Sequence, residues 1–363
     1  MKKFILLSLL FLNLNVNAQT LPSKDVLFSK LKELKEQSKV NALIAGIWQG
    51  DQNILSVAFG ESMTTVPADT SMHVRIGGIT ETFFGTLVMM LVDQGKFGLD
   101  DKISKWLPDL LEADKVTIGM LITNTSGYRD YVRNQNFLEI ITDQPFREIT
   151  RKEIIDFATS DGKMDFPPGT QQGYSHTSFT ILGEVLEKAT GKSLGELFTE
   201  NIFNPLGLSH TGYNINADLP YPVLHAYSSD RGVYEDATFW SPSWTRDSGP
   251  IYSNLNDVAK WANVFGKGKL LTPESFNVLV SRPASAPDPN RFMASGFAVL
   301  NGWFAQNPEF NGYSGGFGYY PPKELTIIVF TTESKDRSSG TQAVNILQDI
   351  SKMLTPDAPI NFK

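Results

Sequence analysis

Apolar positions along the first part of the chain switch between the spacing of helices and that of strands. From 25–39 they recur every three or four residues, which predicts an amphipathic helix. Two alternating runs follow at 42–48 and 53–59, separated by a short polar stretch, and they predict a hairpin. Helical spacing returns over 80–93 and ends at Gly95. The pattern therefore predicts helix, hairpin and helix in that order.

The rest of the chain combines dense turn signals with a few periodic segments. Residues 100–247 are predicted to form helices and irregular loops. A helix is predicted over 255–265, then strands over 294–303 and 325–331, and a closing helix over 342–354. Strands near both ends with a helical insertion between them predict one sheet built from the two termini.

Residues 1–18 have the pattern of an export signal. Two lysines precede an apolar stretch at 4–14, and the small residues at 16–18 match a signal-peptidase site. This apolar stretch is too short for a stable membrane anchor, because spanning a bilayer takes about 20 residues. We expect a mature chain that begins near Gln19, has no membrane anchor, and is periplasmic or secreted.

Composition excludes several classes of function. The sequence has no cysteine, which excludes a lipid-modified cysteine, a disulfide and a thiolate nucleophile. The net charge of −7 becomes −9 without Lys2 and Lys3, with 30 basic and 39 acidic residues, and no basic run occurs. We therefore expect no nucleic-acid partner. The 4 histidines show no ligand spacing, so we expect no metal and no cofactor.

One segment carries a resemblance to a known family. Residues 75–83, Arg-Ile-Gly-Gly-Ile-Thr-Glu-Thr-Phe, resemble the Arg-Ile-Gly-Ser-Ile-Thr-Lys-Thr-Phe segment of class C β-lactamases, DD-peptidases and related esterases. Seven of the nine positions agree. The two that differ are the chemical ones, because Gly78 replaces the serine and Glu81 replaces the lysine.

Two further blocks resemble the same family. Residues 121–127 are similar to its Leu-Leu-Thr-His-Thr-Ser-Gly segment, with Asn124 in the place of the histidine. Residues 166–176 are similar to its Pro-Pro-Gly-Thr…Tyr-Ser-Asn block; Tyr174 is retained and His176 replaces the asparagine. We expect Asn124 to contribute to ligand binding.

A block near the C-terminus lies where the family has Lys-Thr-Gly or His-x-Gly. There Tyr313 replaces the cation or imidazole and is followed by Ser314 and two glycines. We expect Tyr313 and Ser314 to bind substrate. The glycine-rich stretch 314–318 leads into a strand, so it is not a phosphate loop, and we interpret it as an edge strand that lines the cleft.

The resemblance extends from about residue 25 to the C-terminus and implies the β-lactamase/DD-peptidase fold, of class α/β (α+β). In that fold an antiparallel sheet from both termini is flanked by helices and faces a mostly helical lobe across a cleft. Residues 19–75 together with 250–363 would form the sheet domain, and residues 76–249 the helical lobe.

The family's chemistry requires a serine that the chain lacks. A serine attacks a carbonyl, a lysine and a tyrosine handle its proton, and two backbone N–H groups hold the oxyanion. Gly78 has no side chain, so no acyl-enzyme can form there. Ser29 and Lys32 match the Ser-x-x-Lys spacing, but they lie in the first helix, where a chance match is the better interpretation.

The replacements suggest a different acid/base site. Glu81 is either an ordinary surface glutamate or a cleft carboxylate whose pKa burial raises, which would make it a usable acid or base; the resemblance favours the cleft. His176 either shuttles protons near neutrality or merely replaces a hydrogen-bonded asparagine. Tyr174 either acts as an acid or donor, or is a packed aromatic residue.

Two functional hypotheses remain open. In the first, the protein is a repurposed hydrolase or lyase that acts without a covalent intermediate on an ester, amide or glycosidic bond. Glu81 is its base, Tyr174 and His176 supply the acid, and the N–H groups of Gly78 and Gly316 polarise an oxygen. In the second, it is a pseudoenzyme that binds a cell-wall peptide, glycan or protein partner in the inherited cleft. Either way we expect a small-molecule, peptide or oligosaccharide ligand.

Overall fold

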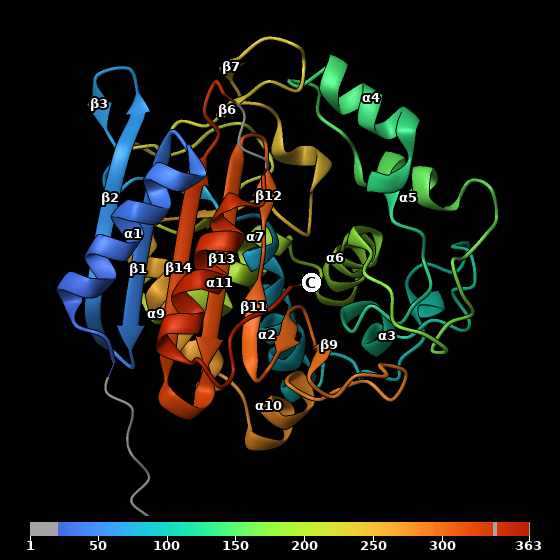
Figure 1. Ribbon diagram of the computed structural model, residues 1–363. Helices are drawn as coiled ribbons and strands as arrows, with labels where there is room; N and C mark the ends of the chain where they lie inside the picture. Colours follow the sequence, from blue (N-terminus) through green and yellow to red (C-terminus); the bar gives the residue numbers. More distant parts are fainter. Residues whose placement is uncertain (1–20, 337–339, 363) are drawn as a thin grey trace, which may run out of the picture.

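The computed structural model describes residues 21–336 and 340–362 (Figure 1). The predicted export signal at 1–18 lies outside these residues. Within them, no helix is both long enough and apolar enough to cross a membrane.

The described residues form one large antiparallel sheet of 9 strands, to which both ends of the chain contribute (Figure 1). This confirms the predicted sheet and its fold class. A hairpin from the N-terminal part pairs with the last strand, so residues almost 300 positions apart become neighbours, as with Ala42 and Thr332. Across the sheet the order is β3 (Val66–Pro67), β2 (Gln52–Met63), β1 (Ala42–Gln49), β14 (Leu325–Thr332), β13 (Tyr313–Tyr320), β11 (Trp303–Gln306), β10 (Ala298–Leu300) and β9 (Arg291–Met293), with β12 (Glu309–Phe310) also paired to β13.

Helices cover both faces of this sheet. On one face α1 (Lys24–Ser38) and α11 (Gln342–Leu354) pack against side chains such as Ile327 and Val329. On the other face α9 (Leu255–Gly266) packs against the alternate residues of the same strand. Because β14 is buried on both faces, its central residues 327–330 form an uninterrupted apolar run and do not alternate with polar ones.

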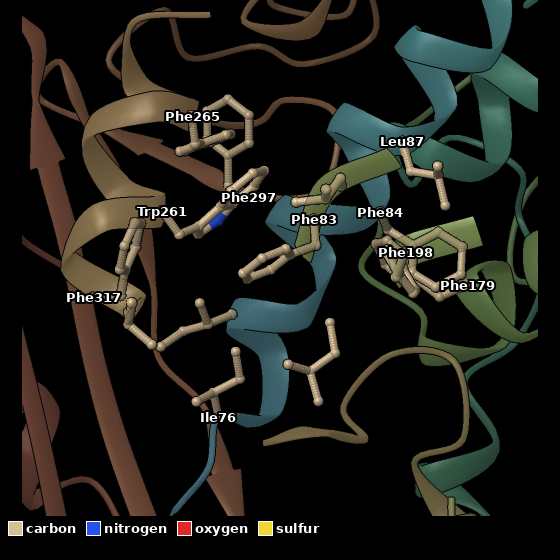
Figure 2. Close-up of a cluster of buried hydrophobic side chains, with 14 of the residues drawn as sticks. Ile76, Phe83, Phe84, Leu87, Phe179, Phe198, Trp261, Phe265, Phe297 and Phe317 are labelled. Atoms are coloured by element: carbon tan, nitrogen blue, oxygen red, sulfur yellow. The ribbon is translucent and has the colours of Figure 1, made fainter. Parts of the chain in front are cut away.

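Helix α2 (Thr80–Asp93) lies at the centre of the molecule and is buried on all sides except near its C-terminal end. Phe83 stacks on Trp261 of α9 with 3.9 Å between ring centroids, and the Trp261 indole N–H donates to Thr82 (Figure 2). Phe84 lies edge-on to Phe198 on the opposite side of the helix (Figure 2). This aromatic packing fixes α2, and therefore the residues at its start, against both the sheet layer and the helical lobe.

In the sequence the helical lobe is inserted between the two segments that build the sheet, and in space it lies to one side of the sheet, on the right in Figure 1. Strand β4, which leads into α2, pairs with β8, so the chain enters and leaves the lobe at one place. The division at residues 75 and 250 into two domains stays a prediction. The remaining elements are α3 (Ile118–Ile122), α4 (Gln135–Asp143), α5 (Arg151–Thr159), α6 (His176–Thr190), α7 (Leu194–Phe198), α8 (Asn204–Leu206) and α10 (Pro273–Leu279), with β4 (Val74–Arg75), β5 (Gly212–Tyr213), β6 (Tyr227–Ser228), β7 (Glu235–Asp236) and β8 (Ile251–Ser253).

Two predictions about strands are wrong. The run 294–303 is not one strand, because Asn301 and Gly302 adopt positive φ and turn the chain between β10 and β11. The glycine-rich 314–318 is not an edge strand. It lies in β13, which pairs with β14 on one side and with β11 and β12 on the other. A second Asn-Gly turn, at 311–312, brings β12 back onto β13.

Candidate active site

Gly77 and Gly78 form the short turn η1 (Gly77–Ile79) that leads directly into α2. Gly77 has φ +48, and a Cβ built on it would lie 2.6 Å from Cβ of Pro308. A Cβ on Gly315 would lie 2.4 Å from Cγ of the same proline. Pro308 therefore occupies a slot between two backbone segments that only glycine leaves open.

Gly78 faces the side-chain amide of Gln306. A Cβ on Gly78 would approach Oε1 of Gln306 to 3.2 Å. The Gln306 Nε2 donates to Oε2 of Glu81 at 3.2 Å and to the carbonyl of Gly296 at 2.9 Å. Because both acceptors lie on the nitrogen side, the amide oxygen is directed toward Gly78.

Glu81 is fully buried one helical turn after Gly78. The Tyr174 hydroxyl donates to its Oε1, and Gln306 donates to its Oε2. Burial raises the pKa of Glu81 to about 7, although His176 and these two hydrogen bonds favour the charged form. Among the described residues no lysine or arginine forms an ion pair with it, so Glu81 is a carboxyl that gains and loses its proton near neutrality.

His176 begins α6 and is oriented by Asp130. Its Nδ1 lies 3.0 Å from Oδ2 of Asp130, whose own side chain is buried. Burial lowers the pKa of His176, but the Asp130 carboxylate outweighs this effect and raises it above the usual value. An N–H on Nδ1 directed to the carboxylate leaves Nε2 as the basic nitrogen. The imidazole lies edge-on to Tyr174, with 4.8 Å between ring centroids.

These groups meet at the wall of one large cavity. It has a volume of about 1180 Å³ and lies between the helical lobe and the sheet. Its other walls combine apolar and polar side chains and come from α4 and the loop that follows it, from residues 240–249, from β9 and β10, and from residues 307–312. Gly78, Tyr174, His176 and Gln306 all line it, and Glu81 lies directly behind them.

Comparison with known proteins identifies the family. The Beta-lactamase family model matches residues 27–349. The chain belongs to this family. It is 27% identical over 278 residues to penicillin-binding protein 4 of Amycolatopsis lactamdurans, covering 72% of this chain and 70% of that protein. It is 28% identical over 223 residues to a D-aminopeptidase of Cereibacter sphaeroides, covering 59% of this chain and only 41% of the D-aminopeptidase.

A solved structure shows the family's fold directly. The D-stereospecific amidohydrolase from a Streptomyces species superposes with a TM-score of 0.79 at 22% identity, and the match covers 89% of this chain and 98% of that one. At this identity the likeness establishes the fold alone.

Within this family fold the structure brings four of the predicted site residues together, namely Gly78, Glu81, Tyr174 and His176. It does not bring Gly316 to the cavity. A Cβ on Gly316 would meet the carbonyl of Ala343 and the side chain of Leu347, both in α11. The neighbouring Gly315 N–H donates to Pro308, so by strand alternation the Gly316 N–H points toward β14.

Three predicted ligand-binding residues also lie outside the cavity lining. Asn124 is buried, and its side-chain oxygen accepts the N–H of Ser175. The Tyr313 hydroxyl donates to the carbonyl of Leu224 at 2.5 Å, which fixes it in the packing against the helical lobe. Ser314 is buried in β13. These three residues pack between elements around the cavity, and their side chains do not line its wall.

Asp130 and Gln306 belong to the site and were not predicted from the sequence. Asp130 lies in Ser-Gly-Tyr-Arg-Asp, just after the block that contains Asn124, and this position beside a motif block is the signal that could have drawn attention to it. Its pairing with His176, 46 positions away, is visible only in the structure. Gln306 has no such signal, because it reaches Glu81 only through a contact across 225 positions of the chain.

Proposed function

We propose that this protein is a hydrolase that activates water directly and forms no acyl-enzyme. One observation carries the proposal: two hydrogen-bonded pairs, His176 with Asp130 and Tyr174 with Glu81, lie side by side at the cavity wall next to Gly78. One pair suits a general base and the other suits a general acid. Compared with the expectation from the sequence, His176 takes the role of base and Glu81 that of proton reservoir, because Glu81 is fully buried.

The proposed step moves protons between these pairs. Nε2 of His176 accepts a proton from water while the water oxygen bonds to the electrophilic carbon of an ester, amide or glycosidic bond. The bond to the leaving group breaks, and the leaving atom takes a proton from the Tyr174 hydroxyl. Tyr174 regains a proton from Glu81, and the proton on His176 is then transferred through water to the Glu81 carboxylate, which restores both groups. Asp130 stabilises the charged imidazole throughout.

The names of the relatives support hydrolysis as the reaction class. They include a D-aminopeptidase, a D-stereospecific amidohydrolase and, at 22% identity over 94% of this chain, a teichoic acid D-alanine hydrolase of Staphylococcus aureus. We also propose export to the cell envelope, which the N-terminal pattern and the cell-wall setting of that last relative support.

The test is turnover by the purified mature chain against a pool of esters, amides, lactones, cell-wall peptides and oligosaccharides, followed by mass spectrometry. We expect His176→Gln and Tyr174→Phe each to lower the rate by 10²-fold or more. His225→Gln is the matched control, because His225 also pairs through Nδ1 with a carboxylate, Asp236, but does not line the cavity. Equal loss in the control variant would contradict the proposed roles.

Ligand binding without turnover is the second candidate. It is favoured by the packing of Gln306 against Gly78, which fills much of the space next to the position where the family has its nucleophile. In that case the same pool yields no product, while one of its members raises the melting temperature of the protein.

A further inference from the structure

The amide of Gln306 presents an acceptor to the cavity in a fixed orientation. Its Nε2 is held by two acceptors, Glu81 and the Gly296 carbonyl. Its Oε1 lies over Gly78, and both residues line the cavity. Rotating the amide by half a turn would place Oε1 against two other acceptors, so the observed orientation is the stable one.

A second glutamine in the same cavity shows the contrast. The Gln172 Nε2 donates to the carbonyls of Thr123 and Met293 at 2.8 and 2.7 Å, and its Oε1 accepts the Met293 N–H at 2.9 Å. Both ends of that amide are satisfied by the backbone. For Oε1 of Gln306, by contrast, no described residue supplies a donor. A group that enters the site is therefore in a position to supply one.

The neighbouring hydroxyl has the complementary character. Tyr174 and Gln306 bind the two oxygens of one carboxylate, so their polar groups lie next to each other at the cavity wall. When Glu81 is protonated it can donate to the tyrosine oxygen, which frees the Tyr174 O–H to point into the cavity. A donor beside an acceptor matches a primary amide, in which the C=O and one N–H point to the same side of the group.

We propose that Gln306 is the specificity-determining residue of this site, and that its side-chain oxygen accepts a hydrogen bond from an N–H of the ligand. As a statement about turnover, the role of Gln306 rests on the proposed function. It then selects amides from the ester, amide and glycosidic bonds that the proposed function leaves open. An ester has no donor and places an oxygen against Oε1, which leaves that acceptor unpaired. Discrimination on such grounds is about tenfold or more.

Three small probes of nearly the same shape test the proposal. Phenylacetamide carries the N–H, methyl phenylacetate has an ester oxygen in its place, and benzyl methyl ketone has a methyl group there and cannot be hydrolysed. Their phenyl group suits the apolar wall formed by Leu138, Ile141 and Trp244. Binding of the amide and the ketone is measured by calorimetric titration, and hydrolysis of the amide and the ester by mass spectrometry.

Wild type, Gln306→Met and Gln172→Met are compared. We expect wild type to bind the amide about tenfold or more tightly than the ketone. In Gln306→Met this preference falls to near one, and amide hydrolysis drops relative to ester hydrolysis. Gln172→Met retains both ratios even if it is less stable, because its oxygen serves the backbone.

Equal binding of amide and ketone by wild type, a preference unchanged in Gln306→Met, or no measurable binding of the amide would overturn the inference. Failure of the proposed function gives a different result. If binding prefers the amide through Gln306 but no probe is hydrolysed, the proposed hydrolase function is rejected and the role of Gln306 in recognition is retained. If hydrolysis occurs and its preference for the amide is unchanged in Gln306→Met, the proposed hydrolase is retained and the role of Gln306 is rejected.

Discussion

The hydroxyl of Tyr174 donates a hydrogen bond to the fully buried carboxylate of Glu81, 93 positions away in the chain. The direction of this bond depends on one proton. When Glu81 is charged, its carboxylate can only accept a hydrogen bond, and the Tyr174 O–H is directed toward it. When Glu81 is neutral, it can donate, and the tyrosine proton is released toward the cavity. Because burial raises the pKa of Glu81 to about 7, both states are populated near neutrality.

The rate of the proposed reaction should therefore have a bell-shaped dependence on pH. It rises as His176 loses its proton, and this acidic limb is shifted upward from the ordinary histidine pKa of 6.5 because Asp130 raises that pKa. It falls on the alkaline side of about pH 7 as Glu81 ionises. The measurement is kcat/KM against pH for any substrate found. If the alkaline limb is unchanged in Glu81→Gln, the group that ionises there is not Glu81.

The free energy of unfolding should also depend on pH through Glu81. Between the ordinary glutamate value of 4.5 and about 7, folded Glu81 keeps a proton that the unfolded chain has lost. Its contribution to stability is therefore complete below about pH 4.5, decreases as the pH rises, and is lost above about pH 7. The span is about 3 kcal/mol.

Thermal unfolding of wild type and Glu81→Gln at several pH values checks this expectation. The melting temperature of the variant should rise relative to wild type between pH 5 and pH 8, since glutamine has no charge to bury. Glu139→Gln, at an exposed position of α4, is the control. A difference between Glu81→Gln and wild type that does not change with pH would show that Glu81 does not titrate in this interval.

Restoring a serine at position 78 should not restore a nucleophile. The new Cβ would lie 3.2 Å from Oε1 of Gln306, and Glu81 stands where the family has its lysine. We expect Gly78→Ser to lose about 1 kcal/mol of stability and to remain unlabelled by a fluorescent penicillin. Gly78→Ala supplies the same Cβ without the hydroxyl. Stoichiometric labelling of the serine variant alone would contradict this account.

The slot that holds Pro308 can be tested by filling it. Gly77→Ala adds a Cβ 2.6 Å from the proline in addition to the strain of a positive φ. Gly95→Ala is the matched control, because Gly95 also has a positive φ but has no atom within 4 Å of the added Cβ. Gly77→Ala should cost about 1–3 kcal/mol more than the control. Equal melting temperatures for the two variants would mean that Pro308 moves freely.

Much of the architecture follows from local pattern. Helices α2 and α11 begin and end where apolar periodicity places them, at 80–93 and 342–354. An Asn-Gly turn accounts for the break in 294–303, whereas the edge-strand prediction for 314–318 failed because β11 and β12 pair with β13. Asn301-Gly302 and Asn311-Gly312 each form a two-residue turn with positive φ at both positions, and this dipeptide interrupts a strand even when the flanking residues remain apolar.

The site could be predicted only in part, because its contacts join distant segments. Motif position was enough to place Glu81, Tyr174 and His176 at the cavity, while their roles stay predictions. It did not indicate the direction of the Gly316 N–H, which depends on the pairing of β13. It also gave no indication of Gln306, because only the folded sheet brings the end of β11 to the start of α2.

The hairpin that returns β12 onto β13 has a consequence for the kind of molecule the cavity admits. The polar backbone groups of β13 beside Gly77 are already paired with the chain's own residues 308–310. An extended polypeptide therefore cannot bind there by adding a strand to the sheet, which is a common way for proteins to hold peptides. A ligand beside these strands has to be recognised by side chains or by backbone groups outside β13, so recognition there is open to change by single substitutions.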